Sequence, residues 1–257
     1  MREAVSNPVR GGCFVMDANR TLIVVPTYNE RDNVAVIVPQ LLTVAPAADV
    51  LILDDASPDG TAQHAQQLFG ANPRFSVLGR TGPRGYGRSL LDSYRVAVDR
   101  DYERLVQMDA DFSHDPEIVP VLIDASRNAD VVIGSRYCEG GSVPNWPLRR
   151  RLLSRFANQY VRIITGVTVC DSTSGFRCYS RRALQVFLKA PIAAEGYAFL
   201  VETTYHAQQA GLQIVEVPII FTDRRGGQSK MSRAIIFESV LKPWGLRFGA
   251  IPRTPNR

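Results

Sequence analysis

The sequence predicts an α/β fold in which a mostly parallel, Rossmann-like sheet is covered by helices on both faces. The first observation is a series of short, continuous apolar runs rich in β-branched residues, which are typical of buried parallel strands. The second is that segments with helical apolar spacing lie between these runs, so strand and helix alternate. The third is a hydrophobic content of 45% in 257 residues, which is sufficient for one large α/β core.

The elements can be assigned in order along the chain. Strands are predicted at residues 21–26, 50–54, 75–78, 105–108 and 131–134, and helices near 31–44, 58–69, 87–100 and 115–127. Ser57 before Pro58 predicts a helix N-cap with proline at the first helical position, and Asp115 before Pro116 repeats this pattern. After about residue 136 the alternation stops, and arginine-rich segments that contain glycine follow.

Two later segments are predicted to be amphipathic helices. In the first, Arg151 and Arg155 share one helical face, while neighbouring leucines and Phe156 form an apolar side. The second, 230–248, holds more apolar residues than one exposed helix needs. Such helices can be solvated, can pack on the core or on a partner, or can lie on an anionic membrane surface. We favour interface helices near a membrane.

Composition and charge narrow the classes of partner. The net charge of +5 and the pI near 9.2 favour nucleic acid, phosphorylated substrates or an acidic membrane surface. No zinc-finger, helix-turn-helix or aromatic RNP pattern is present, so no nucleic acid is expected as a partner. The four cysteines lack CxxC spacing, which argues against a zinc site and a disulfide scaffold. No apolar run approaches the ~18 residues of a membrane span, and no signal peptide is expected.

Two carboxylates follow the fourth predicted strand. Asp109 and Asp111 stand at its carboxyl end, where open α/β sheets bind their ligands. Because alternate residues of an extended segment point the same way, both carboxylates can face one hard cation such as Mg²⁺ or Mn²⁺. The alternative is that the acidic pair only forms a turn.

Two further polar groups follow the first and second strands. They are the segments 26–30 (PTYNE) and 54–61 (DDASPDGT). A nucleotide held at this edge would set its base and ribose against these groups, and the carboxylate of Asp55 suits N–H and O–H donors because it only accepts. Both segments can also be ordinary turns. The glycine segment 80–88 lacks the order of a Walker loop and is expected to be a loop that feeds a helix.

Eight segments occur in an order that resembles a known family. They are 26–30, 54–61, 107–114, 134–137, 141–150, 172–177, 195–199 and 227–231. Together they resemble the family-2 glycosyltransferases of GT-A fold, and within these the polyprenol (dolichol) phosphate mannose synthases, over about residues 20–245. The resemblance implies an inverting transfer of mannose from GDP-mannose to a polyprenyl phosphate, with Mg²⁺ or Mn²⁺.

The resemblance also implies roles for individual residues. Those expected to hold the nucleotide sugar are Pro26, Tyr28, Glu30, Asp55, Asp109, Ala110 and Lys230. Asp109 and Asp111 are the expected metal ligands, and Asp111, Arg136 and Arg150 are the expected catalytic residues. Arg136 and Arg150, with Ser229 on a mobile loop, are expected at the acceptor phosphate.

The implied chemistry agrees with the residue types. A lipid monophosphate has a second pKa near ~6, so it is already an anionic nucleophile and needs no general base. Arginine binds phosphate bidentately and keeps its charge. His114, beside the acidic pair, can touch a phosphate or cap a turn, and we favour the turn. Other readings stay open: UDP-glucose or another nucleotide sugar, a soluble acceptor, or a catalytically silent binding subunit.

Two departures from the family pattern concern sugar or acceptor recognition. The usual GLGxAY segment is replaced by residues 85–90 (GYGRSL), and Leu200 stands where a glutamine is common. We expect a loosely ordered leader (1–19), a GT-A catalytic domain (20–228), and a mobile loop followed by an amphipathic interface helix and tail (229–257). We also expect a peripheral protein on the cytoplasmic side of a membrane, with a membrane protein or a second copy of the chain as candidate protein partners.

Overall fold

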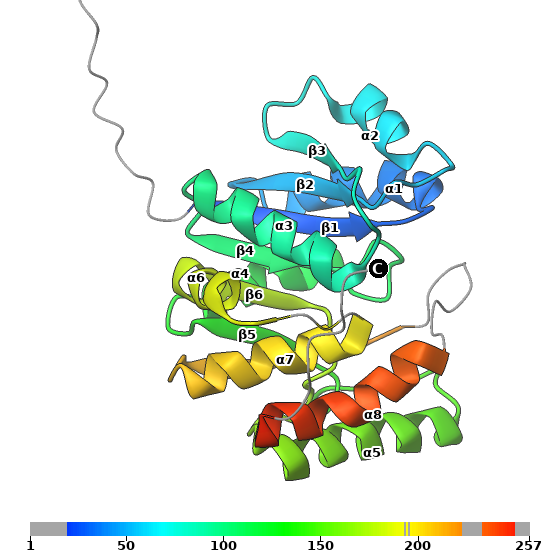
Figure 1. Ribbon diagram of the computed structural model, residues 1–257. Coiled ribbons are helices and arrows are strands. Elements are labelled where there is room, and N and C mark those ends of the chain that lie inside the picture. Colours follow the sequence, from blue (N-terminus) through cyan, green and yellow to red (C-terminus); the bar gives the residue numbers. More distant parts are fainter. Residues whose placement is uncertain (1–19, 193, 195, 223–232, 250–257) are drawn as a thin grey trace, which may run out of the picture.

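The computed structural model describes residues 20–192, 194, 196–222 and 233–249. In these residues seven strands form one sheet, and helices cover both of its faces (Figure 1). The predicted α/β class with a mostly parallel sheet is confirmed. The predicted leader, 1–19, and the residues Ser229 and Lys230 lie outside the described residues.

All five predicted strands and all four predicted helices of the first half are present, although the second and fourth helices begin later than predicted. The strands are β1 (Thr21–Thr27), β2 (Ala48–Asp54), β3 (Phe75–Gly79), β4 (Arg104–Gln107), β5 (Val131–Ser135), β6 (Arg177–Ser180) and β7 (Ile214–Pro218). The helices are α1 (Arg31–Val44), α2 (Thr61–Phe69), α3 (Tyr86–Asp99), the 3₁₀ helix η1 (Pro116–Ile118), α4 (Val119–Ala125), α5 (Leu148–Thr165), α6 (Arg181–Lys189), α7 (Gly196–Gln209) and α8 (Arg233–Phe248).

The strand order determines which loops become neighbours. The order is β3-β2-β1-β4-β6-β5-β7, and only β6 runs antiparallel to the strands beside it. β1 pairs in parallel with both β2 and β4, so the carboxyl ends of these three strands lie next to one another. We call the segments 28–30, 55–60 and 108–115, which follow them, the strand-end loops. The three polar groups predicted from the sequence therefore meet at one edge of the sheet.

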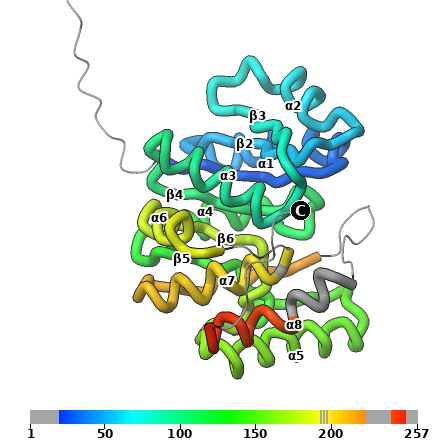
Figure 2. The backbone as a smooth tube through the Cα atoms, in the orientation of Figure 1, coloured from blue at the N-terminus to red at the C-terminus, as the bar shows by residue number. Residues whose placement is uncertain are grey.

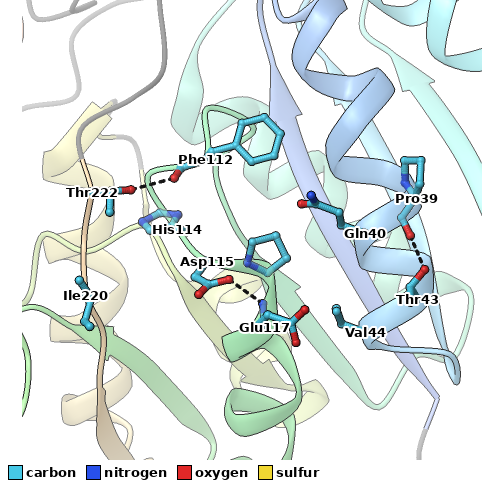
Figure 3. A pocket seen from close by; sticks show the side chains of 11 residues that line it. Pro39, Gln40, Thr43, Val44, Phe112, His114, Asp115, Glu117, Ile220 and Thr222 are labelled. Carbon is cyan, nitrogen blue, oxygen red and sulfur yellow. Dashed lines mark hydrogen bonds between the residues drawn. The ribbon is translucent and has the colours of Figure 1, made fainter.

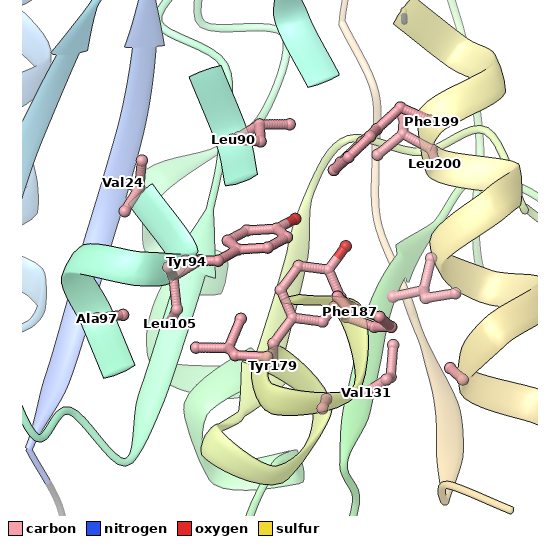
Figure 4. Packing of buried hydrophobic residues seen from close by; sticks show 14 of the residues in the cluster. Val24, Leu90, Tyr94, Ala97, Leu105, Val131, Tyr179, Phe187, Phe199 and Leu200 are labelled. Atoms are coloured by element: carbon pink, nitrogen blue, oxygen red, sulfur yellow. The ribbon is translucent and has the colours of Figure 1, made fainter. Parts of the chain in front are cut away.

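Each face of the sheet has its own apolar core. On one face, α1, α2 and α4 cover the strands through a cluster that includes Ile37, Ile52 and Leu122. On the other face, α3, α6 and α7 pack around Tyr94, with Phe187 and other aromatic rings close to it (Figure 4). The backbone trace in Figure 2 shows the two layers of helices with the sheet between them. Burial on both faces explains the continuous apolar character of the strands.

The helix start predicted at Ser57 is wrong. α2 begins at Thr61 after Gly60, and Gly60 adopts a left-handed φ of 78°. The Ser57 hydroxyl instead donates to Asp54 Oδ1 at 2.5 Å. A short polar side chain beside a buried carboxylate forms a local turn in place of a cap.

The helix start predicted at Asp115 is confirmed in part. The Asp115 carboxylate accepts from the backbone N–H of Glu117 at 3.0 Å and caps the chain as predicted. The turn that follows is the 3₁₀ helix η1, and the α-helix α4 begins only at Val119.

α5 and α8 lie side by side at one end of the molecule (Figure 1). Tyr160 of α5 donates its hydroxyl to the backbone carbonyl of Val240 in α8 at 2.7 Å and accepts from Nε1 of Trp244 at 2.7 Å. Lys242 of α8 also pairs with buried Glu202 of α7 at 2.9 Å. Both predicted amphipathic segments are therefore helices joined to each other. No described helix is long and apolar enough to cross a membrane.

Candidate active site

All three strand-end loops contain a residue in the left-handed region of backbone conformation. Asn29 has φ 59°, Ala56 has φ 57° and Phe112 has φ 61°. Non-glycine residues adopt such angles rarely, at a cost on the order of 1–3 kcal/mol each, and they concentrate at functional sites. In the described part of the chain, three of the four non-glycine residues with positive φ lie in these loops. The surrounding hydrogen bonds must hold the loops in shape.

Asp54, the last residue of β2, provides several of these bonds. Its buried carboxylate accepts from the hydroxyl of Thr27 at 3.1 Å and from the backbone N–H of Ser57 at 2.9 Å. The Ser57 hydroxyl in turn accepts the backbone N–H of Asn29 at 3.0 Å. These contacts connect the first two strand-end loops. Sequence reasoning chose Asp55 as the ligand and missed the organising role of Asp54.

Asp55 connects β2 to the glycine segment. It accepts from the backbone N–H of Gly85 at 2.9 Å and forms an ion pair with Arg80. The Nε of Arg80 also donates to Asp92 at 2.8 Å. Burial alone would lower the pKa of Arg80, but the two carboxylates outweigh it and raise that pKa, so the guanidinium keeps its charge. Arg80 was not among the predicted site residues, although it opens the glycine segment.

Tyr28 stands in the first strand-end loop with a guanidinium over its ring. Cζ of Arg84 lies 4.5 Å from the ring centroid, which is within the range of a cation–π contact. Glu30, in the same loop, accepts from the side-chain amide of Asn33 at 2.7 Å. Pro26 lies on β1, in register with Leu53. The structure thus brings Pro26, Tyr28 and Glu30 to the same edge as Asp55, and their contacts to a nucleoside remain predictions.

The acidic pair lies in the third strand-end loop. Asp111 Oδ1 accepts from the backbone N–H of Ser113 at 3.1 Å and from its hydroxyl at 2.6 Å, which fixes the carboxylate within the turn. The side chain of Asp109 is 37% exposed. Ala110, between them, is buried and packs in the core.

His114 supports this loop from beneath. Its ring stacks on Phe176 with centroids 4.9 Å apart, and its Nδ1 accepts the backbone N–H of Asp109 at 3.2 Å. Burial lowers the pKa of His114, which keeps the imidazole neutral and leaves Nδ1 as an acceptor. This geometry agrees with the turn role that we favoured for His114.

Asp109 and Asp111 can supply two ligands to one divalent cation, which takes its remaining ligands from other groups. Within the described ranges there is no group of three or more His, Cys, Asp or Glu side chains that could hold a metal alone. Mg²⁺ is commonly bound through one or two carboxylates together with substrate phosphates and water. Asp109 and Asp111 are therefore suited to a metal that arrives with a phosphate ligand.

Arg136 and Arg150, the two predicted arginines, both lie close to the indole ring of Trp146. Arg136 is 7% exposed, and its Nε and Nη2 each donate to the carboxylate of Asp171 at 2.7 Å. Arg150 is exposed at the start of α5, and its Cζ lies 3.8 Å from the ring centroid of buried Trp146. Cζ of Arg136 lies 5.6 Å from the ring centroid of Trp146. Contacts of either arginine to phosphate remain predictions.

Asp171 and Trp146 were both missed by sequence reasoning. Burial would raise the pKa of Asp171, but the ion pair and hydrogen bonds with Arg136 outweigh it and hold this pKa below its usual range. Asp171 is 35 residues from Arg136 in sequence, and no spacing pattern indicates such a pairing. Trp146 could have been noticed because it lies four residues before Arg150.

A pocket of about 620 Å³ opens behind the third strand-end loop (Figure 3). Its walls come from the second half of α1, the start of η1 and the segment 220–222, with Phe112 and His114 between them. The Thr222 hydroxyl donates to the carbonyl of Phe112 at 3.0 Å. Asp109 and Asp111 do not line this pocket, so it adjoins the acidic pair without containing it.

Comparisons with known proteins identify the family. The model of glycosyl transferase family 2 matches residues 22–188. The chain is 44% identical over 237 residues to the polyprenol monophosphomannose synthase of Mycolicibacterium smegmatis, covering 91% of this chain and 89% of that protein. It is 42% identical over 229 residues to the undecaprenyl-phosphate mannosyltransferase of Micrococcus luteus, covering 88% of this chain and 94% of that one.

Solved structures show the same fold. Glucosyl-3-phosphoglycerate synthase from Mycobacterium tuberculosis with UDP aligns with a TM-score of 0.66 and 20% identity, over 89% of this chain and 81% of that chain. Its complex with Mn²⁺, UDP-glucose and glycerol 3-phosphate aligns with a TM-score of 0.65 and 21% identity, over the same shares. At such identities the likeness concerns the fold alone, and it confirms the predicted GT-A type.

The fold, the strand-end carboxylates and these matches define a nucleotide-sugar-dependent transferase. The chain belongs to glycosyl transferase family 2. It is a glycosyltransferase, and the resemblance stated from its sequence motifs is confirmed.

Proposed function

We propose that this protein transfers mannose from GDP-mannose to a polyprenyl monophosphate, with inversion at the anomeric carbon. The observation that carries this proposal is the 44% identity, over 91% of the chain, to a polyprenol monophosphomannose synthase. The second relative, a 42% identical undecaprenyl-phosphate mannosyltransferase, supports the same sugar and the same class of acceptor. The guanosine nucleotide is supported by the motif resemblance.

The donor occupies the carboxyl edge of β1, β2 and β4. Its base and ribose lie against Pro26, Tyr28, Glu30 and Asp55, which supply an aromatic ring and acceptor oxygens. Lys230 contributes a positive charge from the segment outside the described residues. The proximity of the strand-end loops supports this arrangement, because a single nucleotide can reach all of them.

The diphosphate lies over Asp109, Ala110 and Asp111 with one Mg²⁺ or Mn²⁺. When bound, the cation neutralises charge that develops on the leaving diphosphate. Two carboxylates at one strand end support this site, and the fold is shared with a protein crystallised with Mn²⁺ and UDP-glucose. Asp109 and Asp111 would hold the cation, and through it the donor phosphates, in one orientation.

The acceptor phosphate meets the donor between the arginines. The lipid phosphate is dianionic in large part at neutral pH and attacks the anomeric carbon directly, so no side chain has to remove a proton. Arg150, stacked on Trp146, neutralises the repulsion between the two phosphates, and Arg136, whose guanidinium is paired with Asp171, is proposed to lie behind it. Ser229, outside the described residues, is proposed as a further phosphate contact.

The polyprenyl tail requires the enzyme to work at a membrane surface. Large apolar side chains are exposed on the paired helices, where they are accompanied by several arginines. These apolar residues are Leu148, Leu152, Leu153, Phe156 and Ile163 of α5, and Val240, Leu241, Trp244 and Phe248 of α8. An apolar surface surrounded by basic side chains is suited to binding an anionic membrane surface. We propose peripheral binding there on the cytoplasmic side, beside the Arg150 end of α5.

The test is a transfer assay with purified protein, Mg²⁺ or Mn²⁺ and a short polyprenyl phosphate. Labelled GDP-mannose is expected to give a lipid-extractable product, whereas UDP-glucose is expected to give little. Product from UDP-glucose alone would instead establish another nucleotide sugar as donor. A water-soluble labelled product would remove the lipid acceptor, and no product under any of these conditions would favour a catalytically silent subunit.

A further inference from the structure

Arg80, the residue that follows β3, has a guanidinium in which every nitrogen contacts a protein acceptor. Its Nη1 forms the ion pair with Asp55, and its Nε donates to Asp92 of α3 at 2.8 Å. Its Nη2 donates to the backbone carbonyl of Pro83 at 3.3 Å. The Arg80 side chain is only 8% exposed. A buried side chain with these contacts is suited to orienting its neighbours.

The carboxylate of Asp55 is held on both of its oxygens. Oδ1 accepts from Nη1 of Arg80, and Oδ2 accepts the backbone N–H of Gly85 at 2.9 Å. The backbone N–H of Asp55 donates to the carbonyl of Thr27 in β1 at 3.0 Å. Both the backbone and the carboxylate of Asp55 are therefore fixed by the protein alone.

The same contacts fold the glycine segment around Asp55. This segment, 80–88, leads from β3 into α3 (Figure 1). Both ends of the stretch 80–85 bind Asp55, so this stretch forms a loop that is closed on the residue after β2. Cζ of Arg84, inside this loop, lies 4.5 Å from the ring centroid of Tyr28. The loop thus adjoins both residues.

We propose that Arg80 is a positioning residue, which holds the Asp55 carboxylate in the orientation in which it accepts from the nucleoside of the donor. The inference rests on the nucleoside-binding role proposed for Asp55. An acceptor that is oriented before its ligand arrives binds more tightly, because less conformational freedom is lost on binding. Arginine suits this role because its planar fork binds carboxylates in fixed directions, whereas lysine supplies a point charge. Arg80 affects the donor only through Asp55.

Arg95 provides a matched control because it shares the partner Asp92. Its Nη1 donates to Oδ1 of Asp92 at 2.7 Å, and its side chain is 58% exposed. Arg95→Gln removes an arginine from the same carboxylate and leaves the ion pair of Arg80 with Asp55 in place. Asp55→Ala provides the second comparison, because Arg80 then keeps Asp92 as its counter-charge.

The experiment measures GDP affinity of the full-length protein by calorimetry with Mn²⁺, together with the melting temperature. Arg80→Gln is expected to weaken GDP binding by about 10-fold or more, and Arg80→Lys by a smaller factor. Arg95→Gln is expected to bind GDP as the wild type does. In protein that carries Asp55→Ala, Arg80→Gln is expected to add less than about two-fold, because its effect passes through Asp55.

Steady-state kinetics distinguish positioning from a general loss of structure. Arg80→Gln is expected to raise KM for GDP-mannose about 10-fold, while kcat and KM for the polyprenyl phosphate stay within about two-fold of wild type. A disturbed fold would instead change all three constants. A change confined to kcat would overturn the role, because Arg80 would then not act on donor binding.

Wild-type GDP affinity in folded Arg80→Gln overturns the positioning role. An undiminished loss in the Asp55→Ala background also overturns it, since Arg80 would then act independently of Asp55, and so does an equal loss in Arg95→Gln. If Arg80→Gln does not fold, Arg80→Lys with and without Asp55→Ala decides by the same comparison.

Failure of the proposed function gives different results. A wild-type protein that binds UDP but not GDP overturns the guanosine donor, and the same set of variants measured with UDP then decides on Arg80. Unchanged nucleotide affinity in Asp55→Ala overturns the nucleoside-binding role of Asp55 and, with it, the role of Arg80.

Discussion

Arg150 stands in the first turn of α5. Its guanidinium is exposed, and the flat indole of Trp146 supports it from below. A stacked guanidinium keeps its planar fork available for a bidentate partner. This geometry allows the charge of Arg150 to be tested separately from the nucleotide site.

Arg150→Ala is expected to reduce kcat/KM for the polyprenyl phosphate on the order of 100-fold, because the repulsion between two phosphates is no longer neutralised. GDP affinity, measured by calorimetry with Mn²⁺, is expected to stay within about two-fold of wild type. Arg149→Ala, which removes the neighbouring exposed arginine, is the matched control and is expected to keep most of the activity. An unimpaired Arg150→Ala enzyme would remove this residue from the acceptor site.

Residues of the site could be predicted where their chemistry is local in sequence. Asp109 and Asp111 can be recognised because they stand two positions apart after an apolar strand. Asp171 and Arg80 do not, because their roles arise from partners 35 and 25 residues away. Tertiary ion pairs of this kind depend on the packed fold, and neither residue carries a local pattern.

At the scale of secondary structure, the loop before β6 is fixed by polar contacts. Asp171 binds Arg136 through two bonds of 2.7 Å, while its backbone N–H donates to Glu216 of β7 at 2.9 Å. Asn158 of α5 accepts the backbone N–H of Ser172 at 2.9 Å. Buried charged and polar side chains thus join the loop before β6 to β7 and α5.

Asp171→Asn is expected to lower the free energy of unfolding by about 3–5 kcal/mol, because it leaves the buried Arg136 without its counter-charge. Urea denaturation at pH 7 measures this. Since the folded pKa of Asp171 is lowered, its contribution is present above the unfolded value near ~3.9 and is lost as the pH falls through the folded pKa. Stability of the wild type should therefore decline below about pH 4, and the Asn variant should lose part of that dependence. A variant as stable as wild type would contradict this account.

The paired helices α5 and α8 provide the second prediction at this scale. Phe156 is 67% exposed on α5, and Glu in its place adds a negative charge to the apolar surface. Phe156→Glu is expected to lower co-sedimentation with anionic phospholipid vesicles several-fold, while activity on a short, water-dispersed acceptor changes little. Leu68→Glu, on the 49% exposed position of α2, is the control. Equal vesicle binding by both variants would exclude α5 as the membrane-facing element.

Elements in the first half could be predicted because each strand is a short apolar run, and all of these runs except the edge strand β3 are mostly buried. β6 could not, because it has only four residues and begins with Arg177, whose buried guanidinium donates to the carbonyls of Ser174, Leu200 and Ser172. β7, α6 and α7 were also left unassigned, although 215–221 is apolar. Here the chain adds an antiparallel strand between parallel ones, and the alternation that guided the prediction no longer applies.

For the whole molecule, the site joins segments that are far apart in the chain. The strand-end loops follow β1, β2 and β4, and the arginines come from beyond β5. A ligand that binds several of them stabilises the folded state, because the unfolded chain cannot bring them together. The gain is about 2.7 kcal/mol when the ligand is present at 100 times its dissociation constant.

The melting temperature therefore reports on the donor and the cation together. GDP with Mn²⁺ is expected to raise it by about 5–10 °C, whereas GDP alone, Mn²⁺ alone, and UDP with Mn²⁺ should raise it less. Asp111→Asn keeps an oxygen that can accept from Ser113 but loses the charge that attracts the cation, so its gain should fall to that of GDP alone. Asp115→Asn alters the nearby exposed cap of η1 and should retain the full gain. A larger rise in melting temperature with UDP would indicate that the donor is a uridine nucleotide sugar. An undiminished rise in Asp111→Asn would show that this carboxylate does not bind the cation.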